Sequence, residues 1–177
     1  IGKTQLAVEY AYRQRDAYPD GVFWINAAEP LTRGLAELGK FLRPDTAGRS
    51  QDEQIHMVAD YLRRHSEALL ILDNLAEPAT LNRPVIPLLV LARLPCKILF
   101  TTRQRELGRF KAIEVSVLPE DAALKLFLRH PSRQVVLASD HPEHAEARAI
   151  CRDLGWLPLA LEVAGAFLEE WSDVSLM

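Results

Sequence analysis

The chain has 177 residues, 49% of them hydrophobic, and its formal net charge at pH 7 is −3. This length and apolar content are typical of one globular domain, or of one domain with a small second one, and suffice to bury a core. The slightly acidic balance excludes a broad basic surface for nucleic acid, and no apolar run approaches the length of a membrane span.

The first predicted element is a helix over residues 3–18, and the residues at its start match part of a phosphate-binding loop. Gly2, Lys3 and Thr4 match the last three positions of G-x-x-x-x-G-K-[ST]. Glycine lets the backbone bend against a phosphate, lysine places a positive charge on the β- and γ-phosphates, and the threonine hydroxyl is a hard oxygen ligand for Mg²⁺. The helix would point its free N–H groups at the same phosphates. Because the chain starts inside this motif and without Met, we expect a fragment cut at both ends.

The next segments alternate between strand and helix signals. Residues 22–26 are β-branched and aromatic and predict a strand, because such side chains fit a pleated surface. Residues 31–42 carry leucines on one helical stripe, and residues 52–65 have a similar apolar stripe, so both predict amphipathic helices. The polar segment between them, residues 44–51, predicts a loop.

Buried strands are predicted at residues 68–74 and 97–103, and a short last strand at residues 112–117. Each of the first two is an apolar run that ends in polar residues, which is typical of a strand in a parallel sheet. Between them, residues 84–94 predict a short helix. This alternation indicates βαβ units and an α/β fold with an open parallel sheet. Together with the phosphate-loop match at Gly2, Lys3 and Thr4, it predicts a fold that resembles the P-loop NTPases, with a parallel sheet sandwiched by helices. In such a sheet, ligands bind beside the carboxyl ends of the strands.

Polar residues at the ends of two strands form the candidate site. Asp73 ends an apolar strand in the form of a Walker B motif, whose acid helps to hold Mg²⁺; the alternative is a strand that simply ends in a helix-capping Asp. Thr101, Thr102 and Arg103 end the next strand, where the arginine would reach a γ-phosphate; the alternative is a surface arginine. The phosphate-binding loop would meet these residues in one crevice.

The pattern changes after residue 118. Pro119-Glu120-Asp121 opens a helix with a proline and two acids in its first turn. Helical signals continue to the end of the chain, with a break at Gly155-Trp156-Leu157-Pro158, and no strand signal follows. We therefore predict a nucleotide-binding α/β domain over residues 1–118, followed by a small all-helical subdomain over residues 119–177.

Four stretches in this order resemble the NB-ARC type of STAND ATPase, a family of signal-transducing P-loop NTPases. They are Ile1-Gly2-Lys3-Thr4-Gln5-Leu6-Ala7, Leu69-Leu70-Ile71-Leu72-Asp73-Asn74, Lys97-Ile98-Leu99-Phe100-Thr101-Thr102-Arg103 and Leu154-Gly155-Trp156-Leu157-Pro158-Leu159-Ala160-Leu161. The resemblance covers nearly the whole chain, and the combination is specific although no single motif is. Residues 18–24 also resemble bacterial members that carry tetratricopeptide repeats.

The resemblance implies a site for ATP or ADP with Mg²⁺. The residues that it makes catalytic are Lys3, Asp73 and Arg103, as phosphate-binding lysine, Walker B acid and sensor arginine. The residues that it makes nucleotide-binding are Gly2, Lys3, Thr4, Gln5, Thr102 and Pro158, the last of which would pack on adenine from the helical subdomain. The ligands that it implies for Mg²⁺ are Thr4 and Asp73, and Thr101 would lie near the sensor arginine.

Two positions depart from the family pattern. Trp156 stands where the family usually has glycine, so the backbone at the adenine contact can differ. Asn74 follows Asp73 where the family often has an acid, so a carboxylate general base is not evident. This favours a switch with slow hydrolysis over fast turnover. Because the first half of the phosphate loop would precede Ile1, we expect weak nucleotide binding by this chain and normal binding by its parent.

The resemblance implies a switch module of a signalling or regulatory protein, off with ADP, on with ATP, and a slow ATPase. Its implied partners are adenine nucleotide, the effector, winged-helix and repeat sensor domains of the same chain, and further copies of itself in the ATP state. We expect it in the cytoplasm, with no membrane contact and no direct nucleic-acid binding. Two alternatives stay open: a continuously turning-over AAA-type P-loop ATPase, which Asn74 disfavours, and a degenerate non-binding scaffold, which the intact Lys3, Thr4, Asp73 and Arg103 disfavour.

Overall fold

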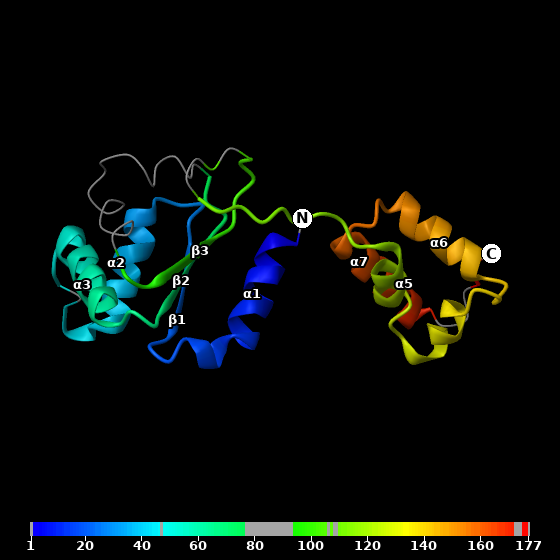
Figure 1. The fold of residues 1–177 in the computed structure, drawn as a ribbon, viewed down its shortest axis with the longest axis horizontal. Helices are drawn as coiled ribbons and strands as arrows, with labels where there is room; N and C mark the ends of the chain where they lie inside the picture. The colour runs from blue at the N-terminus through cyan, green and yellow to red at the C-terminus, as the bar shows by residue number, and fades with distance from the viewer. Residues whose placement is uncertain are drawn as a thin grey trace. The chain divides into compact units, whose positions relative to one another are not determined.

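The computed structural model describes residues 2–46, 48–76, 94–105, 107, 110–171 and 175–176. By its internal contacts the chain divides into two compact units (Figure 1). One is an α/β unit from Lys3 to Ala112, and the other is a helical unit formed by the chain from Ile113 onward, with which Gly2 is grouped. A parallel sheet with helices, followed by an all-helical unit, confirms the predicted fold class. The functional division of the chain into domains at residues 118 and 119 stays a prediction.

The sheet of the α/β unit has three described strands in the order β1-β2-β3, which are β1 (Val22–Asn26), β2 (Leu69–Asp73) and β3 (Lys97–Phe100). Both pairs are parallel, and Leu72 lies opposite Phe100 in the register of β2 and β3. The first four residues of the central strand β2 are at most 1% exposed. An apolar run without polar alternation is what a strand covered on both faces requires.

Helices cover both faces of this sheet (Figure 1). On one face lie α2 (Leu31–Leu42) and α3 (Gln51–Arg64), and on the other lies α1 (Lys3–Arg13). The core under α2 and α3 is built on buried side chains that include Ile25, Leu35, Val58, Leu62, Leu70 and Leu72. The core under α1 contains Ala7, Leu69 and Ile71. Successive residues of β2 thus enter opposite cores, as the two-residue period of a strand dictates.

Two glycines allow α2 to pack closely against its neighbours. A Cβ on Gly34 would collide with Cγ2 of Ile25 in β1. A Cβ on Gly39 would lie 2.7 Å from the backbone oxygen of Gln54 in α3. The helix therefore approaches the sheet on one side and α3 on the other at distances that a larger side chain prevents.

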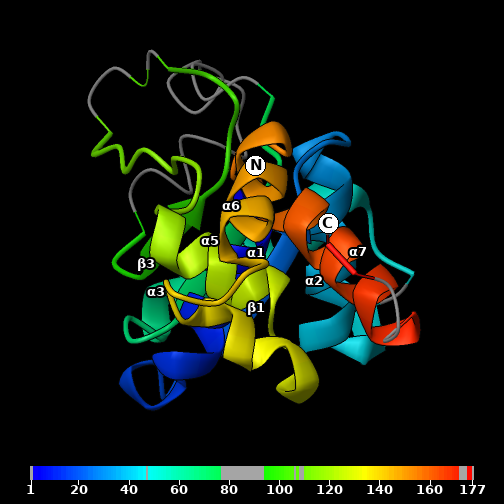
Figure 2. The same ribbon diagram turned by 90° about the vertical axis from the view of Figure 1, so that its right-hand side faces the viewer.

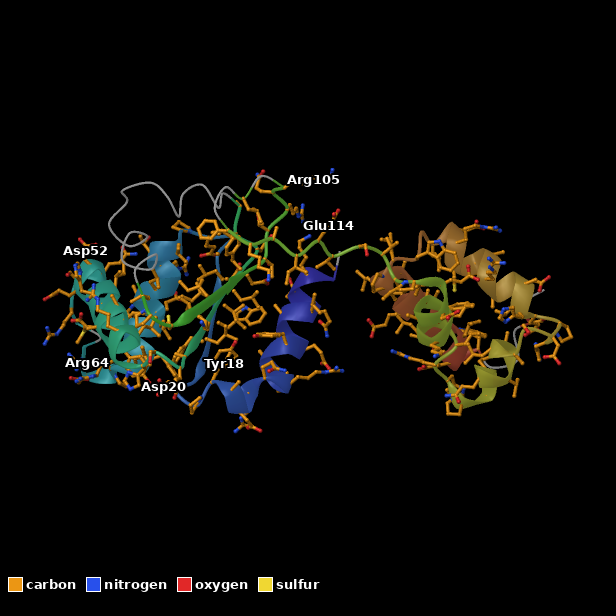
Figure 3. All side chains as sticks on the ribbon, viewed as in Figure 1. Tyr18, Asp20, Asp52, Arg64, Arg105 and Glu114 are labelled. Atoms are coloured by element: carbon orange, nitrogen blue, oxygen red, sulfur yellow. The ribbon has the colours of Figure 1, made fainter. Side chains whose placement is uncertain are left out.

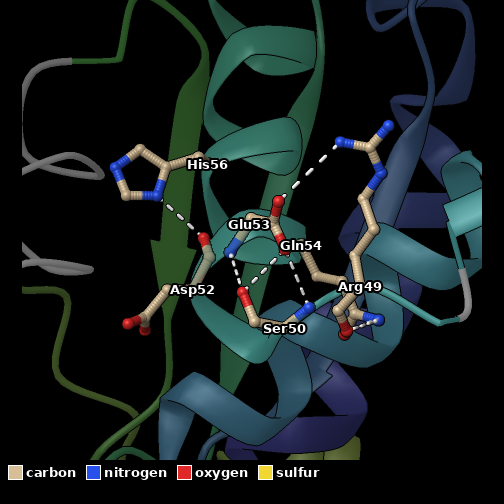
Figure 4. A network of polar contacts seen from close by, with 6 residues as sticks. All are labelled: Arg49, Ser50, Asp52, Glu53, Gln54 and His56. Atoms are coloured by element: carbon tan, nitrogen blue, oxygen red, sulfur yellow. Dashed lines mark hydrogen bonds and ion pairs between the residues drawn. The ribbon is translucent and has the colours of Figure 1, made fainter.

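Helix α3 begins at a capping box (Figure 4). The Glu53 N–H donates to Oγ of Ser50 over 3.4 Å, and Oε2 of Glu53 accepts from the Ser50 N–H over 2.9 Å and from the Ser50 hydroxyl over 2.8 Å. These bonds satisfy donors that the first turn of a helix leaves open. Figure 3 labels Asp52 near the start and Arg64 at the end of α3, so the charges at both ends oppose the helix dipole.

The helical unit consists of α5 (Glu120–Phe127), a 3₁₀ segment (Pro131–Leu137), α6 (His144–Asp153) and α7 (Pro158–Glu170). Helix α5 packs against both α6 and α7 (Figure 2). The core of this unit is formed by buried side chains that include Leu124, Phe127, Leu128, Val136, Cys151 and Leu161.

A Schellman motif ends α6. The Gly155 N–H donates to the Arg152 oxygen over 2.8 Å, and the Trp156 N–H donates to the Cys151 oxygen over 3.0 Å. Gly155 and Trp156 both have positive φ, 64° and 56°, and only the glycine adopts that region without a steric cost. The Trp156 oxygen accepts the Leu118 N–H over 3.1 Å, which ties the start of the helical unit to this turn.

Each unit has one free cysteine in its core, Cys96 in the α/β unit and Cys151 in the helical unit. Burial raises the pKa of both thiols, that of Cys151 to about 11 with a further contribution from the charge of Glu120. In the described part of the chain, no helix is long and apolar enough to cross a bilayer.

Several element predictions require correction. The strand predicted at residues 112–117 is wrong, because residues 111–119 form neither helix nor strand and Ile113 and Val117 are 78% and 45% exposed. A strand needs a neighbouring strand for its backbone hydrogen bonds, and the alternation of side chains in this segment does not provide one. The first helix ends at Arg13 and continues as a 3₁₀ turn (Arg15–Ala17). The helix predicted at residues 84–94 lies outside the described residues, apart from its last one.

Candidate functional site

The candidate site lies where the carboxyl ends of β2 and β3 meet the start of α1. Asp73 is the last residue of β2, Thr101 directly follows β3, and Thr4 is the second residue of α1. Parallel strands end at the same edge of the sheet, so the fold places side chains from distant parts of the sequence side by side. Thr4 and Thr101 are 69 and 28 residues away from Asp73 along the chain.

The carboxylate of Asp73 accepts hydrogen bonds from two threonine hydroxyls. The Thr4 hydroxyl donates to Oδ1 over 2.9 Å and lies 3.2 Å from Oδ2. The Thr101 hydroxyl donates to Oδ1 over 2.6 Å. Hydrogen bonds to a carboxylate are stronger than neutral ones, so the two hydroxyls hold Asp73 between α1 and β3.

The turn after Asp73 is also held by both neighbouring strands. Asn74 has φ of 61°, in the left-handed region that asparagine tolerates better than most residues. Its N–H donates to the Thr101 hydroxyl over 2.8 Å, and the Leu75 N–H donates to the Thr101 oxygen over 2.8 Å. On the side of β1, the Ala27 N–H donates to the Asp73 oxygen over 2.7 Å.

The residues of the predicted phosphate loop lie at the start of α1. Gly2 has φ of 84°, a conformation that favours glycine. Lys3 is the first residue of the helix and is half-buried, while Gln5 is exposed. No acidic residue lies in the first turn of α1, so no side chain of that turn neutralises the positive end of the helix dipole.

The other predicted site residues, Thr102, Arg103 and Pro158, have no hydrogen bond to Asp73 among the described contacts. Thr102 accepts the Gln104 N–H with its hydroxyl over 3.1 Å, and Arg103 is exposed just beyond β3. Pro158 is the first residue of α7 in the helical unit, and its contact with adenine stays a prediction. The structure thus brings Thr4 and Asp73 into direct contact.

The donor atoms at Asp73 fit Mg²⁺. A hydroxyl and a carboxylate within hydrogen-bonding distance are hard oxygen ligands, and Mg²⁺ takes one or two carboxylates while waters and phosphates complete its shell. Among the described residues, no group of three or more His, Cys, Asp or Glu side chains forms a protein-only metal cage. The Thr4 hydroxyl and the Asp73 carboxylate could hold a Mg²⁺ ion whose remaining ligands are waters and phosphate oxygens.

The sequence predicts Thr101 near Arg103 and gives it no role of its own. In the structure its side chain contacts Asp73, and the residue is only 7% exposed. The sequence does contain a signal for this contact. Thr101 directly follows an apolar strand, and the neighbouring strand ends in Asp73, whose carboxylate a threonine at this position can reach.

Comparison with known proteins places these features in context. The model of the NB-ARC domain family matches residues 1–135. Regulatory protein AfsR of Streptomyces griseus is 32% identical over 186 residues, which cover 95% of this chain and 17% of that protein. Regulatory protein AfsR of Streptomyces coelicolor is 32% identical over 181 residues, with the same two coverages.

A third relative comes from a fungus. A nucleotide-binding leucine-rich repeat (NLR)-like protein of Hyaloscypha variabilis is 26% identical over 187 residues, which cover 96% of this chain and 19% of that protein. The chain therefore spans less than a fifth of the length of these relatives.

Proposed function

This chain belongs to the NB-ARC family of nucleotide-binding regulatory modules, and from that premise we propose that it is a molecular switch, off with ADP and on with ATP. The observation that carries the proposal is the 2.9 Å hydrogen bond between the hydroxyl of Thr4 and the carboxylate of Asp73. These two residues are 69 positions apart in the sequence. A Walker A threonine and a Walker B acid must meet in this way to share one cation.

The proposed binding site uses groups of distinct chemistry at the start of α1. Lys3 contributes a positive charge to the phosphates, Gly2 lets the backbone approach them, and Gln5 donates its backbone N–H. Thr4 and Asp73 would hold Mg²⁺, which would neutralise charge on the phosphate oxygens when bound. Beyond β3, Thr102 and Arg103 would contact the γ-phosphate and distinguish ATP from ADP.

Slow hydrolysis suits such a switch. Asn74 stands directly after Asp73, where a carboxylate could accept a proton from the attacking water, and its amide cannot act as that base. Without this help, we expect ATP to persist long enough to hold the on state. The turnover ATPase is the second candidate, and it requires a base from elsewhere in the chain.

The wider assembly is part of the proposal. Two relatives are named regulatory proteins, and this chain spans only part of their length. We propose that effector, winged-helix and repeat sensor domains flank the module in one chain, and that the ATP state self-associates. Pro158 would contact the adenine ring, and the module would work in the cytoplasm without binding nucleic acid itself.

The test is the nucleotide content of the protein at its full natural length, purified without added nucleotide. After denaturation, chromatography identifies what was released, and about one ADP per chain is expected. The Lys3→Ala variant is the matched control and should release little. An empty protein that hydrolyses ATP steadily would favour the turnover enzyme. A protein that releases no nucleotide and binds ATP no better than K3A would favour the remaining alternative, a degenerate scaffold that binds no nucleotide.

A further inference from the structure

Thr101 has an unusual position among the residues around Asp73. It is 7% exposed, and its hydroxyl lies between two groups of the β2 end, the Asn74 N–H at 2.8 Å and the Asp73 carboxylate at 2.6 Å. Its backbone bonds to the same segment, because its N–H donates to the Leu72 oxygen over 3.0 Å and its oxygen accepts the Leu75 N–H over 2.8 Å. One residue therefore contacts four consecutive residues around the acid.

The direction of the hydroxyl bond follows from counting protons. A threonine hydroxyl has one proton to donate and lone pairs to accept with. The Asn74 N–H can only donate, so the hydroxyl accepts from it and gives its own proton to Asp73. The hydroxyl is thereby fixed in a single orientation by the backbone, and it in turn fixes the carboxylate.

The two oxygens of Asp73 are left unequal. Oδ1 accepts from Thr101 at 2.6 Å and from Thr4 at 2.9 Å, whereas Oδ2 has only the longer approach of Thr4 at 3.2 Å. Oδ2 therefore keeps more of its lone-pair capacity for a cation or for a water bound to it. Without the Thr101 bond, the carboxylate could rotate and exchange the two oxygens.

We propose that Thr101 is a positioning residue, which acts through Asp73 to present one carboxylate oxygen to Mg²⁺. The inference rests on the proposed nucleotide site and deepens it, because it identifies the residue that would orient Asp73, the proposed Mg²⁺ ligand. Outer partners of metal ligands orient them and hold one geometry in place. The backbone bonds of Thr101 to Leu72 and Leu75 do not involve its side chain, so we expect the valine and serine variants to keep the strand register.

The test measures how strongly Mg²⁺ improves ADP binding in the protein at its full natural length. A fluorescent ADP analogue is titrated in excess Mg²⁺ and again in EDTA, and the ratio of the two affinities is the readout. Thr101→Val removes the hydroxyl at nearly constant shape, and we expect the ratio to fall by roughly tenfold. The affinity in EDTA should stay within about twofold of wild type, since no cation is then positioned.

Two further variants separate positioning from general stabilisation. Thr101→Ser keeps the hydroxyl and should restore most of the ratio. In an Asp73→Asn background, T101V should lower the ratio little further, because residues that act through one another are not additive. Circular dichroism checks the fold. If T101V is unfolded, Thr101→Cys takes its place, since a thiol is a weaker donor and should lower the ratio in the same direction.

The outcomes distinguish this inference from the proposed function. Wild-type protein that binds no ADP, or binds it without any gain from Mg²⁺, overturns the proposed site and this inference with it. A wild-type gain from Mg²⁺ that T101V retains in full overturns the inference alone. So does an equal loss of affinity in Mg²⁺ and in EDTA, or a serine variant that behaves like valine.

Discussion

Asn74 has a left-handed backbone conformation and directly follows Asp73, the ligand that we propose for Mg²⁺. Its φ is 61°, and its N–H is bonded to Thr101. Asparagine, aspartate and glycine are the residues that adopt this conformation most readily. The backbone therefore accepts an acid here at little cost, and the slow hydrolysis that we propose depends on the identity of one side chain.

We predict that Asn74→Asp speeds ATP hydrolysis, because it adds a carboxylate beside Asp73 without straining the backbone. A positioned general base contributes from about 10²-fold upward, so a gain in kcat of at least about tenfold is expected. Phosphate release at saturating ATP measures it. Asn74→Gly is the matched control, because it accepts the same φ without a carboxylate and should leave the rate unchanged. Equal rates for N74D and wild type would contradict the prediction.

The sequence predicted some residues of the site and not others for a physical reason. Thr4 and Asp73 stand in local patterns that suit phosphate and Mg²⁺ chemistry, so the sequence predicts both for the site, and the structure brings their side chains into contact. Thr101 has a weaker pattern, a threonine directly after an apolar strand, and this pattern does not by itself identify the residue that it contacts. Its contact depends on the register in which Leu72 lies opposite Phe100, and this register is set by packing across the whole sheet.

At the scale of elements, the close approach of α2 and α3 depends on Gly39. We predict that Gly39→Ala destabilises the α/β unit by about 1–3 kcal/mol, because the new Cβ would lie 2.7 Å from a backbone oxygen that cannot turn away. Chemical denaturation measures the change. Gly48→Ala is the control, since its Cβ would have no neighbour within 4 Å and its φ lies outside the range that disfavours a side chain. A G39A variant as stable as G48A would show that the helices separate at no cost.

The capping box of α3 predicts a pH dependence. The Ser50 N–H and then the Ser50 hydroxyl lower the pKa of Glu53 in the folded state. A group with a lowered folded pKa stabilises the fold above its unfolded pKa, and this contribution disappears as the pH falls through the folded value. The Glu53 carboxylate therefore contributes at neutral pH and stops contributing in acid.

We predict that Ser50→Ala costs about 1 kcal/mol at pH 7, the usual loss for an N-cap serine. The difference from wild type should shrink as the pH is lowered past the pKa of Glu53, because the hydroxyl then has no carboxylate to bind. Urea denaturation at neutral and acid pH measures both values. Ser139→Ala, at an exposed position outside the helices, serves as the control. A difference that grows in acid would contradict the sign.

Elements whose signals are local were predicted best. The strand at Val22–Asn26 and the helix at Leu31–Leu42 have the bounds expected from side-chain period and turn residues. The strand expected at residues 112–117 failed because pairing requires a partner that its own residues do not specify. The first helix ended early at Arg13, after which a tighter turn brings the hydroxyls of Tyr10 and Tyr18 to 2.7 Å.

At the scale of the whole molecule, each unit has its own core. The α/β unit closes around Leu62, Leu70 and Leu72, and the helical unit closes around Phe127 and Leu161. The fold class could be predicted from the sequence because alternating strand and helix signals stop where purely helical ones begin. Among the described residues, no buried side chain belongs to both cores, so we predict that either unit can lose its packing while the other keeps it.

The single cysteine in each core makes this independence measurable by alkylation kinetics. Burial and a raised pKa protect Cys96 and Cys151 in the folded units, whereas an unfolded thiol has its ordinary pKa and forms reactive thiolate at pH 8. Pulses of iodoacetamide, followed by peptide mass spectrometry, measure the alkylation rate of each cysteine separately. G39A should raise the alkylation rate of Cys96 alone. Gly165→Ala, whose Cβ would lie 2.8 Å from the Phe127 oxygen, should raise only the alkylation rate of Cys151. If every variant changed both alkylation rates together, the two units would unfold as one.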